Sequence, residues 1–197
     1  MNYLISDTHF NHTNVIRYCN RPFPDVDAMN RTLVNRWNAT VSENDTVYFL
    51  GDFAFSNSVY WLKQLKGKKM MVRGSHDNGA FHSCQDLILH SGKFNFLCVH
   101  NPADIPREWR GWTIHGHTHN NNMENYPFIN GAYKTINVSV ELIGYRPLSL
   151  DRLLDLDIST IKRMDTLDSI PERYGDWCPA NATPQAPKLK SEVFWAE

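Results

Sequence analysis

Short apolar runs alternate with polar loops and helical patterns along most of the chain. Residues 47–50 are β-branched, aromatic and branched aliphatic, which is the composition of a buried strand. Comparable runs predict strands at residues 2–6, 69–72, 94–99, 112–114 and 134–140. Apolar residues at helical spacing predict helices at residues 14–19, 27–39 and 59–65, and residues 150–156 predict a terminal helix or strand. This alternation is typical of an α/β protein.

The composition is that of a soluble globular protein with one domain. The chain has 197 residues, of which 42% are hydrophobic and 21% are charged, enough to build one core. A formal net charge of -1 argues against a protein that binds nucleic acid through bulk electrostatics. No apolar run approaches the roughly 18 residues that span a bilayer, so we expect no membrane association.

The cysteines and the two ends of the chain bear on the cellular compartment and the domain bounds. The first residues lack the basic-then-apolar pattern of a signal peptide, and the four cysteines are scattered without a Cys-x-x-Cys pair. These features predict a cytoplasmic protein with reduced thiols. From residue 176 onward the chain is rich in Pro, Ala, Asn and Lys. We therefore expect one domain over residues 1–175 and an irregular tail over residues 176–197.

Polar residues follow five of the predicted strands. The carboxyl ends of strands in α/β sheets meet at one edge, where such proteins commonly build their sites. Carboxylates and imidazoles together suit first-row ions such as Mn, Fe, Zn, Co or Ni, and a bridging carboxylate holds two ions about 3.5–4 Å apart. The sequence therefore predicts a centre for two divalent ions. The clusters are Asp7-x-His9, Gly51-Asp52, Gly74-Ser75-His76-Asp77, His100 and Gly116-His117-x-His119.

Each cluster taken alone has a simpler explanation. Asp52 after Gly51 is a frequent turn pair, and His100 can be an ordinary residue at the end of a strand. Five such clusters in order, each directly after a strand, make that explanation implausible. A hydrolase with a single zinc ion needs only three protein ligands and an open position, so the surplus of ligands argues against it.

The ordered motifs resemble the calcineurin-like metallophosphoesterase superfamily, in a small bacterial and phage branch. The resemblance spans residues 1–156 and includes the segments 6–12, 20–23, 45–48, 51–55, 137–141 and 144–147. It implies an α/β fold of four layers, in which a two-sheet β-sandwich is flanked by helices. It also implies a phosphoesterase that depends on two metal ions and uses a hydroxide shared between them to attack phosphorus.

The resemblance also assigns roles to individual residues. Asp52 would bridge the two ions, and His76 would stand beside the leaving oxygen. Asp77 would orient the ring of His76 through a hydrogen bond. The first ion would be held by Asp7, His9, Asp52 and His119, and the second by Asp52, Ser75, His100 and His117.

Position 75 departs from the family pattern, which has Asn where this chain has Ser75. A serine hydroxyl is shorter and a poorer ligand than a carboxamide oxygen, so we expect the second ion to be held more weakly. Guanidinium groups offer a planar fork of donors that suits phosphate oxygens. On this basis, and by their place beside the site loops, His12, Arg21 and Arg73 are the predicted substrate-binding residues.

The favoured function is that of a phosphodiesterase acting on a phosphorylated small molecule, a nucleotide or a nucleic-acid end. Protein phosphatases of the superfamily follow Gly-Asp with a further Asp-Arg pair, whereas Phe53, Ala54 and Phe55 follow Asp52 here. Two alternatives remain open. One is a phosphomonoesterase, and the other is a catalytically weakened scaffold that only binds, to which Ser75 points.

Overall fold

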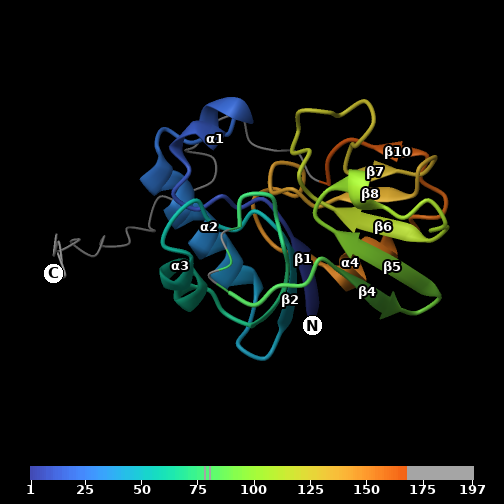
Figure 1. Ribbon diagram of the computed structural model, residues 1–197, viewed down its shortest axis with the longest axis horizontal. Coiled ribbons are helices and arrows are strands. Elements are labelled where there is room, and N and C mark those ends of the chain that lie inside the picture. The colour runs from blue at the N-terminus through green and yellow to red at the C-terminus, as the bar shows by residue number, and fades with distance from the viewer. Residues whose placement is uncertain (78, 80, 168–197) are drawn as a thin grey trace, which may run out of the picture.

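Two β-sheets pack face to face, with helices on the outside (Figure 1), in a computed structural model that describes residues 1–77, 79 and 81–167. The first sheet has the strand order β3-β2-β1-β9 and the second has the order β10-β7-β8-β6-β5-β4. The strands of the first sheet are β1 (Asn2–Ile5), β2 (Thr46–Leu50), β3 (Lys68–Val72) and β9 (Leu148–Ser149). Those of the second are β4 (Asp86–Ser91), β5 (Phe94–Val99), β6 (Trp112–His115), β7 (Ile129–Asn130), β8 (Thr135–Asn137) and β10 (Arg163–Met164).

The helices lie mainly beside the first sheet. They are α1 (Thr13–Tyr18), α2 (Val26–Thr40), α3 (Ser58–Gln64) and α4 (Leu150–Asp155), and one 3-10 turn spans Pro102–Asp104. Asp25 caps α2 by accepting a hydrogen bond from the backbone N–H of Ala28. Figure 1 shows α2 and α3 against the first sheet, and α4 contacts β1 and β9 of the same sheet.

Parallel pairing brings the strand ends that carry the polar motifs to one region. In the first sheet β1 pairs in parallel with β2, and β2 with β3. In the second sheet β5 pairs in parallel with β6, and β6 with β8. A parallel bridge between Ser6 and Ser139 joins the two sheets just beyond these ends. Residues that follow five different strands therefore meet at the junction of the sheets.

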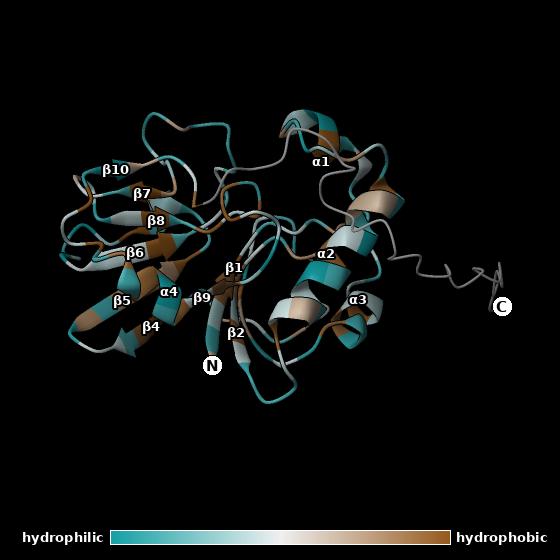
Figure 2. Cartoon of the chain, turned by 180° about the vertical axis from the view of Figure 1, so that it is seen from behind, coloured by the Kyte–Doolittle hydropathy of each residue, from teal (hydrophilic) through white to brown (hydrophobic). Residues whose placement is uncertain are grey.

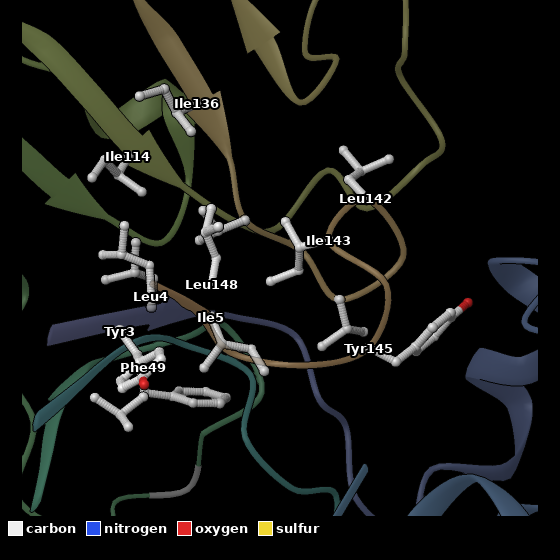
Figure 3. Close-up of a cluster of buried hydrophobic side chains, with 14 of the residues drawn as sticks. Tyr3, Leu4, Ile5, Phe49, Ile114, Ile136, Leu142, Ile143, Tyr145 and Leu148 are labelled. Carbon is white, nitrogen blue, oxygen red and sulfur yellow. The ribbon is translucent and has the colours of Figure 1, made fainter. Parts of the chain in front are cut away.

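The core lies between the sheets and beneath α2. Leu4 of β1 points toward Ile114 of β6 and Ile136 of β8 (Figure 3), and all three side chains are buried. On the other side of the first sheet, Trp37 of α2 packs on Phe49 of β2 with ring centroids 6.3 Å apart. Figure 2 shows hydrophobic residues on β1 and on parts of β4, β5 and β6, and hydrophilic residues along many of the surface loops. This packing gives the strand ends a rigid base.

The predicted α/β fold with two sheets flanked by helices is confirmed, with some differences in its elements. The strand predicted over residues 134–140 ends at Asn137, because the next residues turn to bridge Ser6 of the first sheet. The strand β4, an edge strand in which only Leu89 is buried, and the two-residue strands β7, β9 and β10 are not predicted from the sequence. Residues 150–156 form a helix. The predicted tail over residues 176–197 lies outside the described residues.

Among the residues that the structure describes, no helix is both long enough and apolar enough to cross a membrane.

Candidate metal centre

Six of the predicted ligands meet at the junction of the two sheets. Asp52 Oδ2 lies 3.5 Å from His9 Nε2 and 3.4 Å from His100 Nε2. Asp7 Oδ1 lies 3.9 Å from His9 Nε2 and 3.6 Å from His119 Nε2. Neighbouring ligands around one ion have similar separations, about 3.4 Å for a tetrahedral site with bonds of about 2.1 Å. The donor atoms fall into two groups that could each hold an ion, Asp7, His9 and His119, and Asp52, His100 and His117.

The backbone is left-handed at most of these ligands. This conformation is uncommon for residues with a side chain and concentrates at functional sites, where the surrounding structure enforces it. Here five ligand residues in three loops have this conformation. The residues concerned are Asp7 (φ 59°), His9 (φ 50°), Asp52 (φ 58°), His117 (φ 69°) and His119 (φ 49°).

Two glycines allow the loops to approach the ligands closely. A Cβ atom on Gly74 would lie 2.2 Å from Asp52 Oδ1, and one on Gly116 would lie 2.3 Å from Asp7 Oδ2. Contacts of this length do not occur between real atoms, so any side chain at either position would displace the carboxylate. The glycines of the Gly74-Ser75-His76-Asp77 and Gly116-His117-x-His119 motifs are therefore part of the site's construction.

The carboxylate of Asp7 uses one oxygen for support and leaves the other free. Its Oδ2 accepts hydrogen bonds from the hydroxyls of Ser6 and Ser139 and from the backbone N–H of His117, at 2.5, 3.0 and 2.9 Å. Its Oδ1 is buried and has no hydrogen-bond partner among the described residues. A buried carboxylate oxygen without a donor is costly, and a cation between Asp7, His9 and His119 would satisfy it. The donor set therefore fits a divalent metal ion.

The imidazole of His100 is held in a ligand-like orientation. Its Nδ1 lies 2.8 Å from the carbonyl oxygen of Leu50, to which it donates a proton, and its Nε2 points at Asp52 and lies 3.1 Å from His117 Nδ1. Burial lowers the pKa of His100, but its hydrogen bond to Asp52 and the charges of Asp7 and Asp52 raise the pKa to about 9. Carboxylates that attract a proton to this point would attract a metal cation in the same way.

His9 contrasts with His100 because its pKa is lowered. Burial lowers the pKa of His9 to about 3, in spite of the opposing charges of Asp7 and Asp52. The imidazole is therefore neutral near pH 7, and the neutral form is the one that binds metals. Burial raises the pKa of Asp52, but hydrogen bonds and charge from His100, with the backbone N–H of His76, hold it well below its usual range. Asp52 is accordingly ionised.

A buried ion pair supports His119 from behind. Glu141 Oε1 lies 2.7 Å from a terminal nitrogen of Arg21 and 3.0 Å from His119 Nδ1. Arg21 also donates to the backbone carbonyl oxygens of Asp7 and Thr8, at 2.7 and 2.9 Å. Burial lowers the pKa of His119, but the charges of Glu141 and Asp7 outweigh it and raise the pKa to about 11. The pair thus fixes His119 and the Asp7 loop together.

Arg21 is therefore placed differently from the sequence prediction, which put it against the substrate. Its side chain is fully buried, and its donors are used by Glu141 and by backbone carbonyls. Burial lowers the pKa of Arg21, but the charge and hydrogen bond of Glu141, with the nearby Tyr145 and Cys19, together raise the pKa above its usual value, so the guanidinium stays charged. The side chain turns inward because this carboxylate, 120 residues away, offers it a buried partner. We assign Arg21 a supporting role instead.

Asp77 also has partners other than the predicted one. Its carboxylate accepts hydrogen bonds from the backbone N–H groups of Asp52, Phe53 and Gly74, at 3.0, 3.0 and 2.8 Å. Both oxygens are thus used to tie the loop after β2 to the loop after β3. Asp77 therefore positions Asp52 through the backbone, in place of orienting the ring of His76.

The remaining predicted residues lie around the two ligand groups. His76 is exposed, its backbone N–H donates to Asp52 Oδ1 at 2.8 Å, and its ring lies 5.7 Å from that of His9. Ser75 Oγ lies 3.5 Å from His117 Nδ1, at the outer limit of a hydrogen bond. The ring of His12 lies 5.3 Å from that of His9, whereas Arg73 is exposed at the end of β3.

Sequence reasoning missed Glu141, although a signal for it exists. Residues 138–143 read Val-Ser-Val-Glu-Leu-Ile, and every one of them is buried. A charged residue inside an otherwise apolar segment is almost never fully buried unless it is paired. That position alone therefore indicates a buried partner, although it does not reveal that the partner is Arg21.

Comparisons with known proteins find a matching family and two similar relatives. A family model described as the calcineurin-like phosphoesterase superfamily domain matches residues 1–138. An uncharacterized protein of Methanocaldococcus jannaschii is 47% identical over 160 residues, which cover 78% of this chain and 89% of that protein. The gene 66 protein of Mycobacterium phage L5 is 24% identical, over 77% of this chain and 91% of that protein.

A solved structure shares the fold. The crystal structure of a protein of unknown function from Aquifex aeolicus superposes with a TM-score of 0.63 at 26% sequence identity, and the match covers 79% of this chain and 98% of that one. The described chain thus spans nearly the whole of the molecules it resembles, with the candidate centre inside the matched region.

Proposed function

Because the chain belongs to the calcineurin-like phosphoesterase superfamily, we propose that it is a phosphodiesterase that works with two divalent metal ions. The observation that carries this proposal is the position of Asp52 Oδ2, 3.5 Å from His9 Nε2 and 3.4 Å from His100 Nε2. One carboxylate oxygen thus lies between the two ligand groups, as a bridging ligand must. Two ions there would polarise a phosphoryl oxygen and lower the pKa of water.

The protein's own residues would divide the remaining tasks. Asp7, His9 and His119 form one ligand group, and Asp52, His100 and His117 the other. His76, exposed beside the centre, is the candidate to give a proton to the leaving oxygen, and its backbone N–H steadies Asp52. The hydrogen bonds that the Asp77 carboxylate accepts hold the two loops that carry Asp52 and His76 at a fixed separation.

A diester is favoured over a monoester by the charges that face the centre. A phosphate monoester carries one more negative charge than a diester near neutral pH. Arg21 is turned inward onto Glu141, so its guanidinium cannot balance that charge. His12, whose pKa is lowered chiefly by burial and then by the charges of His76 and Arg21, is neutral near pH 7. A singly charged diester suits these surroundings better.

The test is hydrolysis of bis-p-nitrophenyl phosphate beside p-nitrophenyl phosphate, with Mn²⁺ added or removed by a chelator. We expect turnover only with metal, and faster for the diester. Asp52→Asn should abolish turnover, since it removes the shared negative charge. Faster hydrolysis of the monoester would refute the preference. If elemental analysis finds metal in the protein and there is still no turnover, the result would instead favour the binding scaffold, to which Ser75 points.

A further inference from the structure

Exposed aromatic rings stand beside the candidate metal centre. The residues Phe55 and Tyr18 are 60% and 57% exposed, although both are large and apolar. The ring of Phe55 lies parallel to that of His12, with centroids 4.8 Å apart and an angle of 12° between the planes. Tyr18 meets the same imidazole edge-on, at 6.3 Å and 77°. We call Phe55, His12 and Tyr18 the aromatic rim.

Hydrogen bonds between polar neighbours join the two loops that carry His12 and Phe55. Asn11 Nδ2 donates hydrogen bonds to the carbonyl and hydroxyl oxygens of Ser56, at 3.3 and 3.2 Å. Asn30 accepts from the backbone N–H of Asn11 and donates to its side-chain oxygen, at 3.1 and 2.9 Å. The loop that carries His12 and the loop that carries Phe55 are therefore fastened together. Ordering this surface on binding a ligand would cost little entropy.

The rim is also continuous with the centre. The ring of His12 lies 5.3 Å from that of His9, so one imidazole separates Phe55 from a candidate metal ligand. Because His12 covers one face of the Phe55 ring, the exposed part of Phe55 is its opposite face and its edge. The separations from His9 to His12 and from His12 to Phe55 place the ring of Phe55 no more than about 10 Å from that of His9, close enough to the centre to meet the far end of a bound substrate.

We propose that the exposed ring of Phe55 stacks on the base of a nucleotide whose phosphate lies at the metal centre. The inference rests on the proposed function and selects nucleotides from among the phosphodiesters. Every base has a π-face, and stacking on an aromatic side chain tolerates any of them. The exposed guanidinium of Arg17, 5.8 Å from the centre of the Tyr18 ring, adds a positive charge beside the rim for a second phosphate.

The test compares two ligands that differ only in the base. Isothermal titration of Mn²⁺-loaded protein with adenosine 5′-monophosphate and with ribose 5-phosphate, the monoesters that hydrolysis of the corresponding diesters would release, measures the contribution of stacking. Stacking on one aromatic side chain corresponds to a gain in affinity of about fivefold to 150-fold. We expect the nucleotide to bind at least about fivefold more tightly. Phe55→Ala should abolish that difference and Phe55→Trp should preserve it.

A matched control comes from Tyr133, which is 67% exposed and precedes β8, at the end of that strand away from the centre. Tyr133→Ala should leave both affinities unchanged. Equal binding of the two ligands to the unaltered protein would overturn the proposal, and so would a Phe55→Ala variant that weakens both ligands equally. A Phe55→Ala variant whose sedimentation shows a lost oligomer, with nucleotide affinity intact, would make the rim a contact between chains and likewise overturn it.

Two results separate this inference from the proposed function. Hydrolysis of bis-p-nitrophenyl phosphate without any preference for the nucleotide would leave a phosphodiesterase and remove the stacking role of Phe55. A preference for the nucleotide that depends on Phe55, without hydrolysis of any diester, would leave a nucleotide-binding protein and remove the phosphodiesterase.

Discussion

Removing the negative charge of Glu141 is the sharpest test of how the centre is supported. Glu141→Gln keeps the size of the side chain and one acceptor oxygen, but it leaves the buried Arg21 without a counter-ion. The side chains of Arg21 and Glu141 are 0% and 2% exposed, so water cannot replace the lost charge. The variant also removes the carboxylate that accepts the Nδ1 proton of His119, 3.0 Å away.

The size of the effect follows from this burial. Removing one partner of a buried ion pair costs about 3–5 kcal/mol, because the remaining charge stays desolvated. Gln can still accept one hydrogen bond from Arg21, so we expect a loss near 3 kcal/mol, or about 6–12 °C in Tm for a chain of this size. Loss of the partner that orients a metal-binding imidazole typically weakens metal affinity about 10-fold to 100-fold. We expect a loss in that range.

The assay is urea unfolding of metal-free protein, followed by titration calorimetry with Mn²⁺. The matched control is Asp165→Asn, which breaks the exposed pair between Arg163 and Asp165 (48% and 60% exposed) and should cost less than about 1 kcal/mol. A Glu141→Gln variant as stable as Asp165→Asn would show that the buried charge is not what holds this region. Unchanged Mn²⁺ affinity would refute the role of Glu141 in orienting His119.

Three further predictions concern other parts of the site. In Gly116→Ala the added methyl group would lie 2.3 Å from Asp7 Oδ2, so urea unfolding should show a loss of about 1–3 kcal/mol in the free energy of unfolding. An unchanged urea midpoint would contradict so close an approach of the two loops. Ser75→Asn should raise affinity for the second Mn²⁺ and raise turnover; no gain in either would discredit the idea that Ser75 weakens that site. Burial lowers the pKa of His115 to about 4, whereas the unfolded chain binds that proton near pH 6.5. The neutral side chain thus contributes stability that is fully present above pH 6.5 and falls by up to about 3 kcal/mol as the pH drops to 4. In His115→Phe the free energy of unfolding, measured by urea titration at each pH, should therefore fall less steeply with decreasing pH. The same pH dependence in the variant and the unaltered protein would refute this role of His115.

The strand ends could be located from sequence because their signal is local. An apolar run such as residues 47–50, followed at once by Gly51 and Asp52, marks both a buried strand and the polar residue that leaves it. Parallel pairing then brings such residues together whatever the details of the loops. The grouping of Asp7, Asp52 and His100 could therefore be expected from the sequence alone.

The supporting contacts could not be found in this way because they are not local. Arg21 and Glu141 are 120 residues apart, and nothing in the residues around Arg21 shows that its side chain turns inward. Asp77 stands next to His76 in sequence, yet its oxygens reach backbone N–H groups on a loop 24 and 25 residues away. The edge strand β4 was missed for a related reason, since its single buried side chain, Leu89, leaves no alternating pattern to detect.

The division of the ligands between the two sheets has a consequence for how the molecule holds together. Asp52 follows a strand of the first sheet and His100 follows a strand of the second. An ion bound by both residues would act as a cross-link between the two sheets. At a free ion concentration of 100 times its Kd, it would add about 2.7 kcal/mol to the free energy of unfolding. Loss of the metal would then reduce stability as well as turnover, because the contact between the two sheets would weaken and the chain would become more susceptible to proteases.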